Sequence, residues 1–218
     1  MRKELFSPEG YYHIYNRGVD KREIFGGTKE YEHFLKLLYL CNSKDNIRTR
    51  DFTPNFSEVF STQKGQTLVD ICAYCLMPNH FHLIINERDG GGVSTFMQKL
   101  TTSYTMYFNA RNERSGALFQ GTFKAKQIDK DEYLKYLIAY VHLNPVKLIE
   151  PTWKEVGIKE SKKAQDFLEK YKNSSYTDFL GFQRPQNAIL TKGSLPEYFD
   201  TPTSFKEHIK GWLEYKNE

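Results

Sequence analysis

The feature that most constrains the fold is the segment "HFHLIIN" at residues 80–86, in which imidazole and apolar side chains alternate. In an extended strand, residues i and i+2 lie on one face, about 6 to 7 Å apart, and residue i+1 lies on the other. His80 and His82 therefore share a face, whereas Phe81, Leu83 and Ile85 form an apolar face that must meet a core. The segment predicts a strand whose imidazoles lie on the open side of a sheet. There they can converge on one ion, or form a hydrogen-bonded pair on a half-exposed strand.

The composition is that of a folded protein. The chain has 218 residues, of which 39% are hydrophobic, with 16 Phe and 15 Tyr. This is enough for one domain, or one domain with an appendage, and too rich in core-forming residues for a disordered chain. No apolar run reaches the roughly 20 residues that span a bilayer, and the N-terminal "MRKELFSPEG" has no signal-peptide core. We therefore expect a cytoplasmic protein with no membrane partner.

Three cysteines, an odd number without disulfide-framework spacing, favour a reducing compartment. Two of them lie in "CAYC", directly before the histidine segment. Cys72 and Cys75 are three residues apart, so on a regular strand they face opposite sides. A zinc site made with the histidines is therefore not predicted, and the cysteines are expected to be small buried residues.

The rest of the chain divides into strand-like and helix-like segments. Aromatic and β-branched runs predict strands, and apolar residues at i, i+3, i+4 and i+7 predict helices that begin at capping residues. The expected elements are a strand at 11–18, a helix at 28–44 capped by Thr28, a polar loop at 46–66, strands at 68–76 and 80–86, a helix at 94–110 capped by Ser94, a strand at 117–128, and a helix at 129–144 with an Asp129–Glu132 capping box and Pro145 at its end.

This order predicts an α+β fold: a ferredoxin-like β-α-β-β-α-β antiparallel sheet with an additional helix after it. Residues 1–150 are expected to form this domain. The pattern weakens beyond Lys147, and residues 151–218 are expected to form a C-terminal extension that packs on the domain or trails from it.

The last predicted helix carries polar groups that can complete a metal site. Tyr140 and Asn144 are four residues apart and so share one helix face. An oxygen of Asn144 can join His80 and His82 in a site of mixed nitrogen and oxygen ligands, which suits Mg²⁺ or Mn²⁺ bridged to a phosphate. Tyr140 then lies beside the phosphate. The alternative is that the tyrosines of this helix pack as core aromatics, and spacing alone does not decide between the two.

Charge is concentrated in one segment. The formal net charge is +4, and from Lys99 to Lys126 five basic residues stand against the single acid Glu113. Such a patch indicates a polyanionic partner or a solvated helix end and loop.

Four ordered blocks carry a family resemblance. They are "YYHIYNRG", "AYCLMPNHFHLII", "TTSYTMYFNARNERSGALFQGTFKAK" and "YLIAYVHLNPVK", and "SSYTDFLG" at 174–181 is a further family-like element. Over residues 11–147 the chain resembles the REP-associated tyrosine transposases, the bacterial branch of the single-tyrosine HuH transposases (IS200-like transposases). The resemblance implies a ferredoxin-like nuclease that cuts single-stranded DNA beside a hairpin, using a metal and one tyrosine.

By position in these blocks, the resemblance implies that His80 and His82 are the HuH pair, Asn144 is the helix-borne ligand and Tyr140 is the nucleophile, with Mg²⁺ or Mn²⁺ as cofactor. Tyr104 is a rival nucleophile, but its helix is expected on the other face of the sheet. The basic residues expected to hold the DNA backbone are Arg17, Arg111, Arg114, Lys124 and Lys126. The family further implies a monomeric, nucleoid-associated bacterial protein.

The expected activity is to cut and rejoin DNA through a 5′-phosphotyrosine intermediate. Two alternatives stay open: a non-catalytic hairpin DNA-binding module on the same fold, and a metal-dependent phosphodiesterase that attacks with water. The sequence departs from the family pattern in the long loop at 46–66 and after Phe182. Both departures leave the choice of DNA site open.

Overall fold

The centre of the protein is a four-stranded antiparallel sheet. The computed structural model describes residues 6–45, 55–199 and 201–214. The strands are β1 (Tyr11–Arg17), β2 (Val69–Met77), β3 (His80–Glu87) and β4 (Lys124–Ile128), in the order β2-β3-β1-β4. All neighbours are antiparallel, so the predicted ferredoxin-like α+β fold is confirmed.

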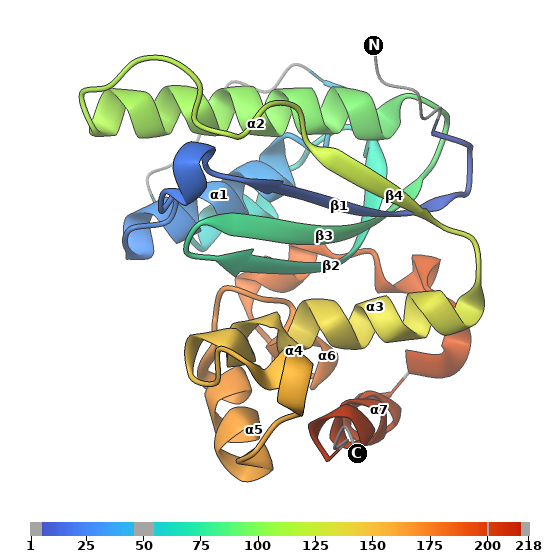
Figure 1. Ribbon diagram of the computed structural model, residues 1–218. Helices are drawn as coiled ribbons and strands as arrows, with labels where there is room; N and C mark the ends of the chain where they lie inside the picture. Colours follow the sequence, from blue (N-terminus) through green and yellow to red (C-terminus); the bar gives the residue numbers. More distant parts are fainter. Residues whose placement is uncertain (1–5, 46–54, 200, 215–218) are drawn as a thin grey trace.

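Three long helices cover the two faces of this sheet (Figure 1). Helices α1 (Thr28–Leu40) and α2 (Gly92–Arg111) lie on one face, and α3 (Asp131–Leu143) lies on the other. The shorter helices are η1 (Val19–Lys21), η3 (Glu58–Ser61), η4 (Asn144–Leu148), α4 (Trp153–Val156), α5 (Ser161–Lys170), α6 (Tyr176–Phe179), η5 (Pro185–Ile189), η6 (Lys192–Ser194), η7 (Glu197–Phe199) and α7 (Pro202–Leu213).

The predicted helix caps are wrong in detail. Thr28 is the first residue of α1 rather than its cap, and α3 follows Lys130 without a side-chain cap, so the predicted Asp129–Glu132 capping box does not form. The predicted strand at 117–128 is shortened to β4, because residues 117–123 are an irregular segment that touches β1 through a Gly18–Phe119 bridge.

Helix α2 begins at Gly92, two residues before the predicted cap Ser94, because the carboxylate of Glu87, five residues earlier in the chain, caps it. The buried Glu87 accepts hydrogen bonds from the backbone N–H groups of Gly92 at 3.1 Å and Val93 at 2.9 Å. A Cβ on Gly92 would lie 2.2 Å from the Leu68 carbonyl oxygen, so only glycine allows this approach. A negative charge at the N-terminus of a helix also interacts favourably with the helix dipole.

A β-bulge corrects the expectation for the cysteines. The pairing of β2 with β3 shifts between Ile71 and Ala73. The extra residue changes the alternation, so Cys72 and Cys75 lie on the same face and not on opposite ones. Both are fully buried without disulfides, as expected of small core residues.

The second face of the sheet is not open, contrary to the expectation from sequence. Phe81, Leu83 and Ile85 face the core beneath α1 and α2, as predicted. On the other face, Ile84 is fully buried beneath α3, and the side chain of His82 is 6% exposed. The histidines therefore lie at the edge of a second core.

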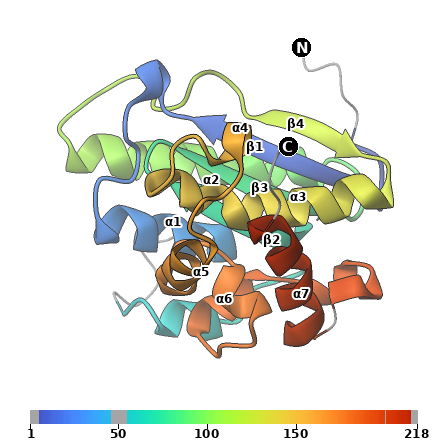
Figure 2. The same cartoon turned by 60° about the horizontal axis from the view of Figure 1, so that its bottom comes forward.

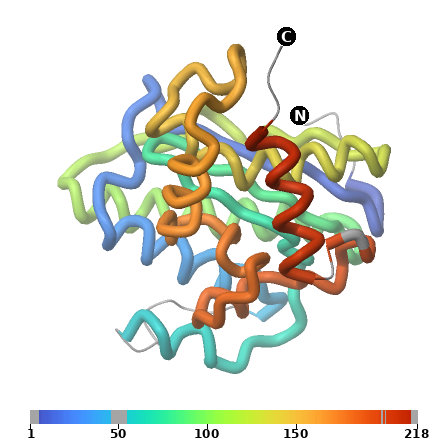
Figure 3. Tube along the Cα trace, turned by 90° about the horizontal axis from the view of Figure 1, so that it is seen from below, coloured from blue at the N-terminus to red at the C-terminus, as the bar shows by residue number. Residues whose placement is uncertain are grey.

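The C-terminal extension covers the outer side of α3. Figures 2 and 3 show α5, α6 and α7 gathered next to α3, and their apolar residues belong to the second core. The residues after Phe182 form η5 to η7 and α7. Within the predicted loop at 46–66, residues 46–54 lie outside the described residues, and the remainder contains η3. No helix in the described ranges is long and apolar enough to cross a membrane.

The Glu87 cap gives a stability test. We expect Glu87→Ala to lower the free energy of unfolding by about 2 to 4 kcal/mol, because it leaves buried N–H groups without acceptors. Glu87→Gln, which keeps one acceptor, should cost less. The measurement is urea unfolding. The matched control is Asp89→Ala, which removes an exposed carboxylate paired with Lys44 and should leave stability unchanged. Equal midpoints for Glu87→Ala and the parent would contradict the cap.

Candidate active site

A cavity of about 510 Å³ lies between the second face of the sheet and α3. Its walls come from β1, the start of β3, β4, α3, η4 and α4. The residues that line it are His13, Tyr15, Asn16, Arg17, His80, His82, Gln120, Lys124, Lys126, Tyr133, Tyr136, Leu137, Tyr140, Asn144, Lys147 and Lys154. The structure therefore brings His80, His82, Tyr140 and Asn144, predicted from two separate motifs, to one cavity.

The two predicted imidazoles are close enough to share an ion. Across the β1–β3 ladder, His80 lies opposite Arg17 and His82 lies opposite Tyr15. The ring centroids of the histidines are 5.0 Å apart. A ring nitrogen binds a metal at about 2 Å, so two rings that share an ion have centroids within roughly 6.5 Å of each other. The observed spacing meets this requirement.

His80 and His82 each use Nδ1 for a hydrogen bond within the protein, so Nε2 of each ring is left for another partner. Nδ1 of His80 lies 2.6 Å from Oδ1 of Asn79, and the amide of Asn79 is fixed because its Nδ2 donates to the Lys21 carbonyl. Because Oδ1 can only accept, the proton of His80 is on Nδ1 and its Nε2 has a free lone pair. Nδ1 of His82 and Nε2 of His13 lie 2.8 Å apart and share one proton. When Nδ1 of His82 holds it, the lone pair on Nε2 of His82 is also available to a metal.

All three imidazoles are neutral at pH 7. Burial, together with Arg17, Lys154 and Lys147, lowers the pKa of His80 to about 4. Burial and two neighbouring lysines lower the pKa of His13 to about 4, and burial and the adjacent imidazoles hold the pKa of His82 well below its usual range. A neutral imidazole is the form that binds metals.

The amide of Asn144 can supply the oxygen ligand. Asn144 is 1% exposed, and its Nδ2 donates to the Tyr140 carbonyl at 3.1 Å, which leaves Oδ1 for another partner. Among the described residues, no group of three or more His, Cys, Asp or Glu side chains can hold a metal. A site here therefore needs the Asn144 amide beside the two histidines, and this donor set fits Mg²⁺ or Mn²⁺ that also binds phosphate oxygens.

The phenol of Tyr140 lies between the imidazoles and a lysine. Its ring is 5.6 Å from that of His82, nearly perpendicular to it. Nζ of Lys154 donates to the Tyr140 hydroxyl at 2.8 Å and lies 4.1 Å from the centre of its ring. An ammonium group in this position stabilises negative charge on the phenol oxygen.

The rival tyrosine lies elsewhere. Tyr104, on α2, is fully buried in the core on the other face of the sheet, and its hydroxyl donates to the Ile24 carbonyl. Its position on that face agrees with the expectation from sequence and separates it from the histidines.

The cavity is strongly cationic. Five of its lining residues are Lys or Arg, and the residues that line it within the described chain include no Asp or Glu. The predicted DNA contacts Arg17, Lys124 and Lys126 are among them. Such a lining concentrates positive potential and favours a polyanion.

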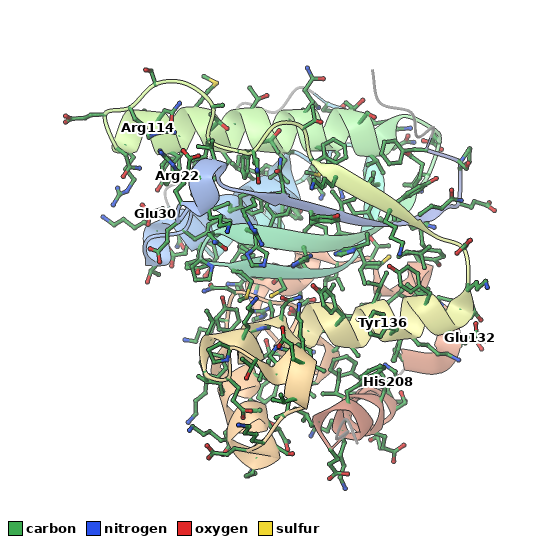
Figure 4. The ribbon with its side chains drawn as sticks, in the orientation of Figure 1. Arg22, Glu30, Arg114, Glu132, Tyr136 and His208 are labelled. Atoms are coloured by element: carbon green, nitrogen blue, oxygen red, sulfur yellow. The ribbon has the colours of Figure 1, made fainter. Side chains whose placement is uncertain are left out.

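The other two predicted DNA contacts are not at this cavity. Arg111 pairs with Glu30 at 2.6 Å. Arg114 bonds Asn109 and the Ala117 carbonyl, at the far end of α2 in Figure 4. Their role in DNA binding stays a prediction.

Comparison with known proteins gives the family. A family model described as "Transposase IS200 like" matches residues 29–144, more than half of the chain. The chain belongs to the IS200-like transposase family. A solved structure of a REP-associated tyrosine transposase bound to a REP hairpin is similar over 90% of this chain and 88% of that one, with a TM-score of 0.52 and 15% identity. At that identity the likeness shows the fold alone. No curated protein matches the chain.

Sequence reasoning missed two residues of this IS200-like transposase that touch the predicted site. His13 lies on β1, whose alternation places it with Tyr15 and Arg17 on the cavity face. The alternation in β1, combined with the pairing of β1 with β3, would have been enough to predict that His13 lies beside the histidines of β3. Lys154 lies in the short helix α4, beyond the end of the family match at residue 144. It belongs to no apolar repeat that would have predicted its position.

The histidine orientations can be tested by nitrogen-15 NMR of the imidazoles. We expect His80 to be neutral at pH 7 with its proton on Nδ1, and to become charged only near pH 4. His208 is an internal control with the opposite proton position, because its Nε2 bonds the Lys135 carbonyl. Asn79→Ala should relax the preference of His80. A doubly protonated His80 at pH 7 would contradict the geometry.

Proposed function

We propose that this IS200-like transposase cuts and rejoins single-stranded DNA next to a hairpin, through a 5′-phosphotyrosine on Tyr140. One observation carries the proposal: the phenol of Tyr140, two imidazoles and the Asn144 amide line one cationic cavity. That combination offers a nucleophile, a metal-ligand set and a phosphate-binding surface in one place.

The proposed reaction is a transesterification. The Tyr140 oxygen forms a bond to the scissile phosphorus, the bond from phosphorus to the 3′ oxygen breaks, and that oxygen leaves as a 3′-hydroxyl after taking up a proton. The phenol loses one proton, so the step is balanced, and the reverse attack by a 3′-hydroxyl rejoins the strand.

Charge on the nucleophile is the main difficulty. A free phenol ionises near pH 10, so forming a phenolate at pH 7 costs about 4 kcal/mol. The ammonium of Lys154 bonds the Tyr140 oxygen and supports the charge that develops on it. Arg17 and Lys124 from neighbouring strands would hold phosphates on the opposite wall.

A bound Mg²⁺ or Mn²⁺ would polarise the scissile phosphate as a Lewis acid. The residues proposed to hold it are His80 and His82, through Nε2, and Asn144, through Oδ1. His13 and Asn79 would act indirectly by fixing the direction of the two rings.

The hairpin is proposed as the partner on two grounds. The structurally similar REP-associated transposase is bound to a REP hairpin, and the cavity here is lined by cations alone among its charged residues in the described chain. A non-catalytic hairpin-binding module and a water-using phosphodiesterase would share these features, so the experiment must detect the covalent intermediate.

The decisive test is covalent capture. We expect the protein, incubated with Mn²⁺ and a hairpin oligonucleotide with single-stranded arms, to form a denaturant-resistant adduct that Tyr140→Phe abolishes. The hydroxyl lost in that variant is the only group of Tyr140 that can attack phosphorus. The adduct is measured on a denaturing gel with labelled DNA.

Tyr104→Phe is the matched control and should still form the adduct once its folding is checked, because its hydroxyl lies in the opposite core. Cleavage without an adduct would favour the phosphodiesterase. Binding with neither cleavage nor metal dependence would favour the binding module.

Metal and DNA should bind cooperatively. The proposed ligands carry no charge, and five Lys or Arg side chains line the cavity. The cavity lining therefore supplies no negative charge to balance a divalent ion. Phosphate oxygens supply it, as is usual for Mg²⁺. We expect Mn²⁺ to bind the Tyr140→Phe protein about tenfold or more tightly with hairpin DNA present, a typical coupling. Calorimetric titration measures it. His82→Ala should remove the coupling while DNA binding persists, and equal Mn²⁺ affinity with and without DNA would oppose the idea.

A further inference from the structure

A second, smaller cavity of about 190 Å³ adjoins the candidate active site. Tyr136, Tyr140 and Lys154 line both cavities, so the two meet at the Tyr140 side chain. Trp153 of α4 and Trp212 of α7 complete its aromatic wall, and these are the only two tryptophans of the chain. We call this second cavity the aromatic pocket.

The rings at the aromatic pocket present a surface suited to stacking. Tyr136 is 40% exposed and labelled on α3 in Figure 4. Its ring lies 5.4 Å from Trp212, 6.0 Å from Tyr140 and 6.1 Å from Tyr133, and it is nearly parallel to the last two. The tyrosines thus form a row along α3 that leads to the pocket.

Cations lie at both ends of the tyrosine row. Nζ of Lys126 lies 4.4 Å from the Tyr133 ring, and Nζ of Lys154 lies 4.1 Å from the Tyr140 ring. A row of rings flanked by lysines matches the repeating chemistry of a single strand, in which each base is attached to a charged backbone. Proteins that hold unpaired strands combine stacking rings with such a positive track.

We propose that the aromatic pocket receives one unpaired nucleobase of the DNA strand, next to the phosphate that Tyr140 attacks. The inference rests on the proposed function. An apolar cavity of about 150 Å³ accommodates a benzene ring, so the pocket has room for one base ring and not for a base pair. A paired base stacked in a duplex cannot enter, which makes the pocket a selector for single-stranded DNA.

The location of the pocket makes it a property of this chain's extension. Trp153, Lys154 and Trp212 all lie outside the family match at 29–144. Tyr136, Tyr140 and Leu143 of α3, which complete the lining, lie within that match. The base that the pocket accepts would therefore depend on residues of the extension as well as on α3. The aromatic pocket would thus act as a specificity site beside the reacting groups, with which it shares Tyr140 and Lys154.

The two tryptophans allow a direct test without cleavage. Tyr140→Phe protein is titrated with a hairpin oligonucleotide that carries single-stranded arms of about ten nucleotides, while tryptophan fluorescence is recorded. We expect quenching on binding. In a scan in which each arm base in turn is replaced by an abasic site, one position next to the cleavage site should weaken binding about 5- to 100-fold, the range for one stacked base.

Variants locate the effect. Trp212→Ala in the same background should weaken binding of the intact oligonucleotide and flatten the abasic scan, whereas Trp212→Phe, which keeps a ring, should preserve the scan. Phe182→Ala removes an aromatic that is 56% exposed away from both cavities and should change nothing. Thermal unfolding identifies any variant that fails to fold, and the abasic scan of the Tyr140→Phe protein, which needs no change at Trp212, keeps the test valid in that case.

The outcomes separate this inference from the proposed function. A flat abasic scan together with unchanged binding by both Trp212 variants would overturn the pocket, even where the parent protein forms a covalent adduct. A base-specific quench in a protein that never forms an adduct would sustain the pocket and remove the proposed cleavage.

Discussion

The packing of α3 against the second face of the sheet is the contact on which the candidate site depends. Leu134, Ile138 and Val141 of α3 belong to one core with Ile84 of β3 and with β2 residues. Because that side of the helix is fixed, the neighbouring side holds Tyr140 over His82 at a ring separation of 5.6 Å. A rotation of α3 by one residue would bury the phenol or move it from the imidazoles, so the apolar stripe determines the position of Tyr140, the proposed nucleophile.

The extension holds α3 from its outer side. His142, fully buried, packs against Phe179 and Phe205 of the extension, 4.9 and 5.2 Å between ring centroids. Its Nδ1 bonds the Ile138 carbonyl, and its Nε2 lies 2.8 Å from Ser175 Oγ, which also bonds the backbone of β2. Burial lowers the pKa of His142 to about 3, so its ring stays neutral. The neutral ring connects α3 to the extension through these hydrogen bonds. The boundary proposed near residue 150 therefore separates segments of sequence that share one core.

Sequence alone predicted the elements whose cause is local. Strict alternation in β3 placed His80 and His82 correctly, and the four-residue spacing of Tyr140 and Asn144 placed them on one side of α3 and η4. It failed where an interaction outside the local pattern intervened: the bulge in β2 depends on pairing with β3, and the start of α2 depends on the Glu87 side chain at the end of β3. Lys154 reaches Tyr140 only through tertiary packing. Local patterns thus indicated which polar residues share a face, while the groups around them required the fold. The ligand and nucleophile roles stay predictions.

The electrostatics of the cavity connect these parts. Neutral ligands and five cations make a poor site for a free divalent ion, since each positive charge repels it at short range. The same arrangement is well suited to a phosphodiester strand, whose negative charges would compensate the lysines and a bound metal together. Carboxylate ligands would have bound the ion without DNA. The proposed imidazole and amide ligands would instead make a complete site conditional on the strand. The aromatic pocket, as proposed, would make the position of that strand conditional on one unpaired base. Chemistry at Tyr140 would then require the polyanion, the ion and the base at the same time.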